Sequence, residues 1–319
     1  MSADMLDFVV TGRELHGSNI LVVELQDPDG QDLPAFDAGA HVDVEVAPGL
    51  MRQYSLCNDP AERHRYRLGI LRVLDSRGGS RQAHELLVPG RKVRIGRPRN
   101  QFPLDLTAQY SVLVGGGIGI TPILAMAFDL HSRGMEFELH YCARSGASAA
   151  FLDELKRVPF AERVKLHFDD ATDGARLDPQ ADLPAPASGT QVYFCGPEGF
   201  MTWLAARCEA MGYTPKQLHR EHFSADVSLA GDSFEVVLQR SGLTVPVPEG
   251  TSIVKALAKA GIRVETMCGQ GICGTCLTDV LEGIPDHRDS FLTDEEHAAN
   301  DQMTLCCSRA LTARLVLDL

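Results

Sequence analysis

Three cysteines stand close together in the segment MCGQGICGTC, residues 267–276. Cys268, Cys273 and Cys276 have the spacing C-x4-C-x2-C, and Cys306 follows after 29 further residues. Four thiolates at this spacing are typical of a plant-type [2Fe–2S] cluster. The glycines between them let the backbone wrap closely and aim N–H groups at the cluster sulfurs. We therefore expect these four cysteines to be the ligands of such a cluster.

A zinc site or a group of buried thiols is the competing interpretation. Structural zinc sites favour paired C-x2-C knuckles or C-x2-C with histidines, and the sequence has no second knuckle. Cys307 competes with Cys306, but adjacent side chains of an extended segment point to different sides, so one of the two is expected to ligate. Cys57, Cys142 and Cys208 are expected to be small buried residues.

A plant-type cluster, with a potential of about −400 mV, carries one electron at a time. It therefore cannot accept a hydride from a nicotinamide. A flavin takes two electrons and releases them singly, so the cluster predicts a flavin site and a nicotinamide site elsewhere in the chain.

The segment 50–100 is a candidate for the flavin site because it holds 12 basic and only 4 acidic residues. It begins with the motif RQYSL, in which Arg52 suits a phosphate, Tyr54 suits stacking on a flat ring and Ser55 suits its edge. The later motif RGGS, residues 77–80, offers backbone N–H groups and a hydroxyl to an anion. A simple strand and a hairpin turn remain the structural alternatives.

The run VLVGGGIGITP, residues 112–122, predicts a strand that enters a glycine turn and then a helix. Thr121 is expected to cap a helix that Pro122 begins, and such a helix N-terminus suits a pyrophosphate. The run does not match G-x-G-x-x-G, so the ordinary Rossmann fingerprint is absent. Cys195-Gly196-Pro197 follows another expected strand, and ligands bind at such strand ends in open α/β sheets. Ordinary turn chemistry is the alternative for both motifs.

Three blocks surround these motifs. Residues 1–107 alternate short apolar runs with turn residues, which indicates an antiparallel barrel or sandwich. Residues 108–222 alternate strands and helices, which indicates a parallel sheet, with helices expected at 123–131, 151–158 and 199–211. Residues 232–319, after a linker at 223–231, begin with two strands and a helix that Thr251 or Ser252 caps and Gly261 ends.

The charge pattern excludes one class of partner. The formal net charge is −13, so neither a nucleic acid nor an anionic membrane surface is expected to bind the chain. The first residues have no signal-peptide pattern, and glycines and a proline break the most apolar stretch, 112–130. We expect a cytoplasmic protein with reduced thiols.

In this order, the motifs RQYSL, RGGS, GGGIGITP, CGP and C-x4-C-x2-C…C resemble those of the phthalate dioxygenase reductase family, over essentially the whole chain. That family includes the reductases of vanillate O-demethylases. The resemblance implies three domains: an antiparallel β-barrel for the flavin (1–107), a ferredoxin reductase-like α/β domain for the nucleotide (108–222) and a β-grasp plant-type ferredoxin domain (232–319).

The resemblance also implies the cofactors FMN, NADH and a [2Fe–2S] cluster. Leu71 stands where some relatives have a lysine, and Arg72 or Arg81 is the candidate to compensate. Arg144 leaves NADPH open as an alternative to NADH. The FMN site implied is Arg52, Gln53, Tyr54, Ser55, Gly69, Ile70, Leu71, Arg77, Gly78, Gly79, Ser80, Thr121 and Phe223. The nicotinamide site implied is Gly117, Ile118, Pro122, Arg144, Cys195, Gly196 and Pro197.

The expected function is that of an electron-transfer reductase. NADH reduces FMN, and single electrons leave through the cluster to the terminal component of a Rieske oxygenase that acts on an aromatic compound. No side chain is expected to act as a strong acid, base or nucleophile, and the rim of the cluster loop around Gln270 and Ile272 is the expected docking face. The alternatives are a reductase for a P450 or a di-iron oxygenase, and a redox sensor or carrier without turnover. Nothing in the sequence demands more than a monomer.

Overall fold

The computed structural model describes residues 5–73, 78–170, 176–223 and 227–319 of the chain. The chain divides into two compact units, Met1–Glu221 and His222–Leu319. Among the described residues, every helix is too short or too polar to span a lipid bilayer.

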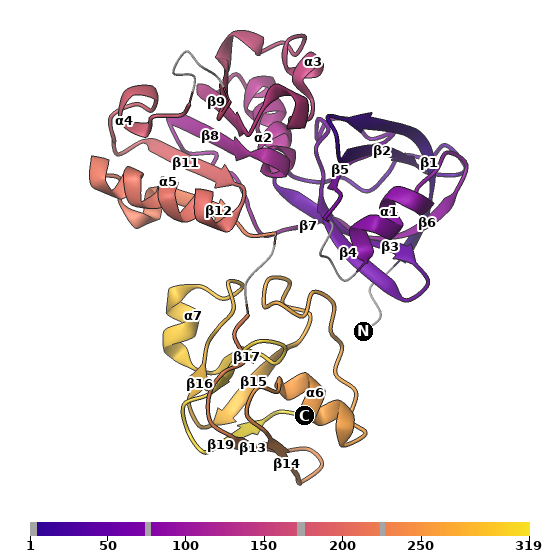
Figure 1. The fold of residues 1–319 in the computed structure, drawn as a ribbon, viewed down its shortest axis with the longest axis vertical. Helices are drawn as coiled ribbons and strands as arrows, with labels where there is room; N and C mark the ends of the chain where they lie inside the picture. The colour runs from indigo at the N-terminus through magenta and orange to yellow at the C-terminus, as the bar shows by residue number, and fades with distance from the viewer. Residues whose placement is uncertain (1–4, 74–77, 171–175, 224–226) are drawn as a thin grey trace. The chain divides into compact units, whose positions relative to one another are not determined.

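An antiparallel sheet forms the first part of the N-terminal unit (Figure 1). An isolated bridge between Leu56, just after β4, and Leu68 in β5 joins the two ends of the sheet and closes it into a barrel. The barrel core consists of the inward-facing apolar residues, such as Phe8, Val23 and Val44. Its strands in sheet order are β4 (Leu50–Ser55), β3 (Ala40–Ala47), β6 (Lys92–Gly96), β1 (Met5–His16), β2 (Ile20–Gln26) and β5 (Tyr66–Leu71), with β7 (Arg99–Asn100) paired to β3 and helix α1 (Gly79–Leu86) packed on β3, β4 and β5.

A parallel five-stranded sheet forms the second part of this unit (Figure 1). Both of its faces are covered, so its central strands are apolar along their length rather than alternating. Leu113 and Tyr193 pack with helix α2 (Ile120–Ser132), whereas Val112 and Phe194 pack with helix α5 (Glu198–Met211). The strand order is β10 (Val164–Phe168), β9 (Phe137–Ala143), β8 (Tyr110–Gly116), β11 (Thr190–Cys195) and β12 (Leu218–Glu221), and the short helices are α3 (Leu152–Leu155) and α4 (Pro179–Asp182).

The barrel and the parallel sheet share a hydrophobic core. Ile20, Val22 and Phe102 of the barrel belong to the same buried cluster as the residues of α2. This shared core explains why the first two expected domains form one compact unit. It also brings the ends of barrel strands close to the ends of parallel strands.

The helix predicted at 151–158 is present but shorter, because only Leu152–Leu155 is helical. Phe151 adopts a left-handed conformation with φ 61°, and its backbone N–H donates to His16 Nδ1 at 3.0 Å. The Arg67 guanidinium lies 5.1 Å from the centre of the Phe151 ring. Contacts with the barrel therefore override the local helical preference.

Two other boundaries differ from those expected. Helix α2 begins at Ile120, so Thr121 lies within its first turn and does not cap it; its hydroxyl donates to the Ile118 carbonyl at 2.9 Å. The fifth parallel strand, β12, was not predicted, because LHRE has no apolar run. Its place at the sheet edge explains the polar sequence, since one side of an edge strand has no neighbouring strand.

A mixed five-stranded sheet and two short helices make up the C-terminal unit. Ser252 is the N-cap of α6, accepting from the Lys255 N–H, and Gly261 follows the helix with φ 81°, as expected. The sheet order is β14 (Leu243–Val247), β13 (Phe234–Leu238), β19 (Arg314–Leu317), β15 (Leu277–Glu282) and β17 (Gln302–Thr304), accompanied by the pair β16 (Pro285–Asp286) and β18 (Arg309–Ala310) and by the helices α6 (Ile253–Lys259) and α7 (Asp294–Ala299). The three-part architecture expected from the resemblance is confirmed.

Candidate functional site

The four cysteines expected to bind the cluster converge. The Cys268 sulfur lies within hydrogen-bonding reach of the Cys273 and Cys306 sulfurs, and the Cys276 sulfur lies within reach of that of Cys306. The backbone N–H of Gln270 points at the Cys268 sulfur from 3.3 Å. Four sulfurs in one place, with an N–H donor aimed at one of them, fit a [2Fe–2S] cluster.

Cys307 is also buried, and its sulfur lies within reach of the Cys306 sulfur, but its other contacts differ from those of the four converging cysteines. It contacts the Thr304 hydroxyl at 3.1 Å and lies against Gly271, where any Cβ would overlap it. Gly271 has φ 72°, so both its conformation and its closeness to Cys307 exclude other residues. This arrangement supports Cys306 as the fourth ligand and gives Cys307 a packing role behind the loop.

The two motifs expected to hold the flavin phosphate lie together. The Arg52 guanidinium packs on Gly79 so closely that a Cβ there would overlap it. Gly79 is the first residue of α1, and Gly78 before it has φ 84°. A helix N-terminus beside a guanidinium and the Ser80 hydroxyl fits a phosphate group.

Two of the expected flavin residues, Arg77 and Leu71, provide no phosphate contact in the part of the chain that the structure describes. Arg77 lies outside the described residues. Leu71 ends β5 and is partly buried against the shared core. Its apolar side chain offers no charge to a phosphate. Of its two suggested replacements, Arg81 lies nearer the turn, with its guanidinium 3.9 Å from where a Cβ of Gly78 would stand.

The remaining flavin residues line the strand ends of the barrel. Tyr54 packs against the barrel core, and burial raises the pKa of its hydroxyl to about 12. The Gln53 amide contacts the His41 ring at 3.3 Å, and the Ile70 carbonyl contacts the His84 ring at 2.8 Å. Gly69 faces the glycine turn of the parallel sheet, since a Cβ on it would lie 2.7 Å from Thr121 Cγ2 and 3.4 Å from Ile118 Cδ1. The flavin and nicotinamide residues thus meet where Gly69 faces Ile118, beside Thr121.

A second contact links the flavin motif to Glu221, a residue that the sequence did not single out. The Ser55 hydroxyl donates to Glu221 Oε2 at 3.3 Å, although 166 positions separate the two residues. Burial raises the pKa of the Glu221 carboxyl to about 8, the Ser55 hydrogen bond opposing the shift. Burial also raises the pKa of the Cys195 thiol, and the nearby Glu221 carboxyl adds to that shift. Glu221 therefore holds a proton at neutral pH beside the two predicted motifs, a role that a lone glutamate in a polar segment does not signal.

The nicotinamide motifs also lie against each other. A Cβ on Gly119 would overlap the Cys195 carbonyl, so glycine permits the turns after β8 and β11 to touch. Phe200, in the first turn of α5, covers this junction, lying 2.9 Å from a Cβ position on Gly116 and 2.8 Å from one on Gly196. Sequence reasoning missed Phe200, which gave no signal beyond its place after Cys195-Gly196-Pro197.

Arg144 lies at the far end of the same sheet edge. It follows β9 and is exposed, and the backbone N–H of Asp170 donates to its carbonyl at 3.2 Å. Asp169 and Asp170 follow β10 and are exposed as well. The position expected to meet the nucleotide ribose therefore has one arginine and two adjacent carboxylates.

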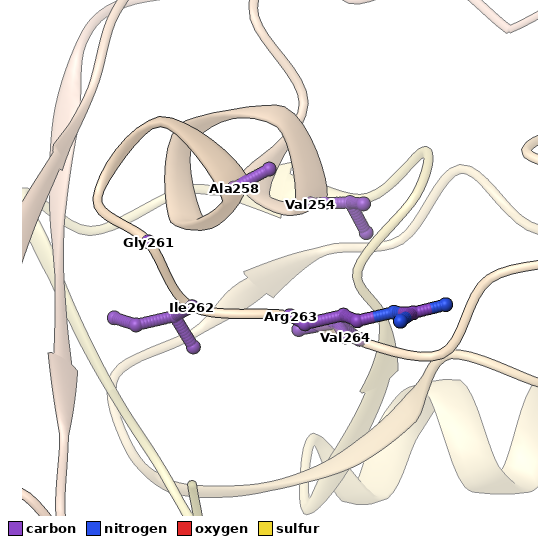
Figure 2. Close-up of a pocket in the computed structure, with 6 residues that line it drawn as sticks. All are labelled: Val254, Ala258, Gly261, Ile262, Arg263 and Val264. Carbon is purple, nitrogen blue, oxygen red and sulfur yellow. The ribbon is translucent and has the colours of Figure 1, made fainter.

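Phe223 and a surface hollow belong to the C-terminal unit. The Phe223 side chain is exposed, and its expected role at the flavin stays a prediction. Figure 2 shows a hollow beside α6 that contains none of the predicted site residues; it is lined by Val254, Ala258, Gly261, Ile262, Arg263 and Val264.

We predict that Cys306→Ser abolishes the visible absorption of the cluster and the reduction of cytochrome c, because one of the four converging thiolates is lost. Reduction of the flavin by NADH should persist, since its residues lie in the other unit. The matched variant Cys307→Ser should keep the cluster, because a serine hydroxyl can still bond to Thr304. Cluster loss in Cys307→Ser with retention in Cys306→Ser would reverse the ligand assignment.

We predict that Glu221→Gln raises stability at alkaline pH but not at acid pH. The ordinary glutamate pKa is 4.5 and the folded value is about 8, so wild-type stability falls as pH rises from 4.5 to 8 and then levels off. The amide cannot ionise, so its advantage should grow over that window to at most about 5 kcal/mol. Melting followed by flavin fluorescence measures this, and Glu209→Gln, at an exposed site on α5, is the control. An advantage independent of pH would contradict the shift.

Comparisons with known proteins agree with this geometry. The family of 2Fe-2S iron-sulfur cluster binding domains matches residues 236–311. The vanillate O-demethylase oxidoreductase of Pseudomonas sp. (strain HR199 / DSM 7063) is 48% identical, over 99% of this chain and 100% of that protein.

Two solved structures match nearly the whole chain. Phthalate dioxygenase reductase, described as a modular structure for electron transfer from pyridine nucleotides to [2Fe–2S], has a TM-score of 0.75 and 37% identity, over 99% of this chain and 98% of its own. An intact type IV self-sufficient cytochrome P450 monooxygenase has a TM-score of 0.87 and 41% identity, and this chain spans 41% of it. The chain thus belongs to the phthalate dioxygenase reductase family, whose members are FMN- and NADH-using [2Fe–2S] reductases of oxygenase systems.

Proposed function

We propose that this chain is the reductase of a two-component Rieske oxygenase that demethylates or hydroxylates an aromatic compound. When bound, FMN would take a hydride from NADH and the [2Fe–2S] cluster would pass the electrons on singly. The 48% identity to a vanillate O-demethylase oxidoreductase over the full length of both chains supports this partner class.

The contact between the flavin and nicotinamide motifs carries the proposal. Gly69 faces Ile118, and the Ser55–Glu221 hydrogen bond lies beside Cys195. Hydride transfer requires two flat rings in close contact, and this is the place where both sets of expected residues meet.

The side chains at this place orient and shield rather than react covalently. Arg52 and the N-terminus of α1 would hold the flavin phosphate, and Ser55 would bond to the ring edge. Glu221 holds a proton at its carboxyl up to about pH 8, one hydrogen bond away from Ser55 Oγ. Phe200 covers the glycine turns, which limits the access of water and oxygen to that side of the site.

The oxygenase is proposed to dock on the rim of the cluster loop, around the partly buried Gln270 and Ile272. Residues 232–319 carry 7 basic and 13 acidic residues, so a basic surface on the partner would be attracted. We further propose that the domains end near the expected boundaries at 107, 222 and 231, and that the chain acts as a monomer. None of the nine cysteines, all among the described residues, forms a disulfide, which supports a reducing compartment such as the cytoplasm.

A P450 is the second candidate partner. The self-sufficient P450 that matches this chain contains a part with a similar fold, and that part is 41% identical to this chain. The same electron relay therefore serves a P450 in a related protein.

Reconstitution distinguishes the two partners. We expect this chain to support NADH-dependent demethylation of vanillate by the oxygenase component of a Pseudomonas vanillate O-demethylase, with no turnover of a P450 supplied as a separate protein. Cys273→Ser should stop the coupled reaction but leave flavin reduction by NADH, which separates failed docking from a failed flavin site. If the chain supported turnover of the P450 but not of the oxygenase, the proposed partner would be wrong and a P450 would take its place.

We also expect NADH to be used in preference to NADPH, because Asp169 and Asp170 repel a 2′-phosphate near Arg144. An exposed charge interaction is worth about 1 kcal/mol or less, so Asp170→Ala should raise kcat/KM for NADPH by about fivefold at most, with little change for NADH. Steady-state kinetics with both nucleotides measure this, and Asp182→Ala in α4 is the control. An equal gain with both nucleotides would contradict the charge effect.

A further inference from the structure

Three side chains with metal-binding groups converge in the C-terminal unit, separate from the cluster cysteines. The ligand atoms of His287, Asp289 and His297 all lie within 4.8 Å of one another. His287 and Asp289 lie in the segment between β16 and α7, and His297 lies in α7. The Asp289 side chain is fully buried, that of His287 is 9% exposed and that of His297 is 25% exposed. We call these three residues the His–Asp–His cluster.

The buried His287 ring is the unusual member. Neither ring nitrogen makes a hydrogen bond of ordinary geometry, although the Asn300 side chain lies close enough to interact with the ring. Its Nδ1 lies 3.8 Å from Asp289 Oδ1, too far for a hydrogen bond, and its ring centre lies 4.5 Å from that of His297. An imidazole has two ring nitrogens, and burying them with one weak contact is costly, so the position favours a group that binds a ring nitrogen.

Asp289 is held in place by its other contacts. Its Oδ2 accepts the backbone N–H groups of Phe291 at 3.2 Å and Leu292 at 2.9 Å, and contacts His297 Nε2 at 3.3 Å. Its Oδ1 accepts the Ser308 hydroxyl at 3.3 Å. A carboxylate oxygen has two lone pairs, so Oδ1 keeps one for a further ligand. Carboxylates that bind metals are supported by hydrogen bonds of this kind.

We propose that the His–Asp–His cluster binds a divalent transition-metal ion, with Zn²⁺ the best match. Two imidazole nitrogens and one carboxylate oxygen are ligands that zinc prefers, and water would complete the tetrahedron. In such a site the ligand atoms stand about 3.3–3.5 Å apart, which follows from bonds of about 2.0–2.1 Å. His297 Nε2 lies 3.3 Å from Asp289 Oδ2, and His287 Nδ1 lies 3.8 Å from Asp289 Oδ1. Since the three ligand atoms lie within 4.8 Å of one another, binding requires the side chains to rotate inward by up to about 1.5 Å.

The site lies behind the cysteine loop and shares no ligand with it. A Cβ on Gly271 would lie 2.8 Å from Asp289 Cβ, and the backbone N–H of Ser290 donates to the Gly271 carbonyl at 3.1 Å. An ion here would fasten the segment 287–290 to α7, and this segment supports the loop that carries Cys268 and Cys273. We therefore expect metal binding to raise the melting temperature of the C-terminal unit.

The experiment uses the holoprotein, dialysed against a mild chelator, with the cluster absorption followed throughout to exclude replacement of iron. Equilibrium dialysis with Zn²⁺ should find one bound ion per chain. His297→Gln, whose amide can still bond to Asp289, and His287→Leu, which fills the buried space, should each weaken zinc binding at least about tenfold. His64→Gln, at an exposed position in the other unit, should not.

Copper identifies the ligands independently. The oxidised [2Fe–2S] centre is diamagnetic, so the electron paramagnetic resonance of one equivalent of Cu²⁺ should show coupling to two nitrogens in the wild type and to one in each variant. Equal zinc uptake by the wild type, His297→Gln and His287→Leu would overturn the proposal, as would no uptake at all. If His287→Leu does not fold, His297→Gln decides alone.

Discussion

Four sulfur atoms must meet at one point of the C-terminal unit, and much of that unit follows from this requirement. Three sulfurs come from a loop of nine residues, which bends sharply enough only because glycines occupy its tightest positions. The fourth comes from Cys306, just after β17, and the pairing of β17 with β15 brings it back to the loop. The Cys307 sulfur packs against Gly271, and the Phe291 ring packs against Gly274. Both contacts support the loop, and both leave no space for a side chain at the two glycines.

In the N-terminal unit the corresponding constraint is the closeness of two sets of strand ends. One hydrophobic core spans the barrel and the parallel sheet, so the end of β5 at Gly69 and the turn after β8 at Thr121 are held at van der Waals distance. The strand ends β4 and β12 meet through the Ser55–Glu221 hydrogen bond. A shared core is stiffer than a linker between separate domains, and direct hydride transfer depends on small changes in ring separation.

Family membership and the separate units together suggest how the chain divides its task. The N-terminal unit is proposed to align two flat rings at the ends of buried strands, where burial raises the pKa of the Glu221 carboxyl to about 8. The C-terminal unit holds a one-electron centre near its surface, with Cys268 partly exposed and acidic residues in excess. The proposed zinc site adds a second metal to this unit, on the side of the loop where Asp289 contacts Gly271.

The sequence alone determined the cluster ligands' spacing, the order of the flavin and nucleotide motifs, and the succession of barrel, parallel sheet and ferredoxin-like sheet. These features are local, because a cofactor selects residue types at fixed short spacing and each sheet type has its own apolar pattern. The tertiary structure alone decided the contacts between distant segments. Glu221 meets Ser55 across 166 positions, Phe151 leaves the helical conformation to reach His16 in the barrel, and His297 joins His287 and Asp289 through the placement of α7. Such contacts depend on how whole elements pack, and packing energy is spread over many residues that carry no motif.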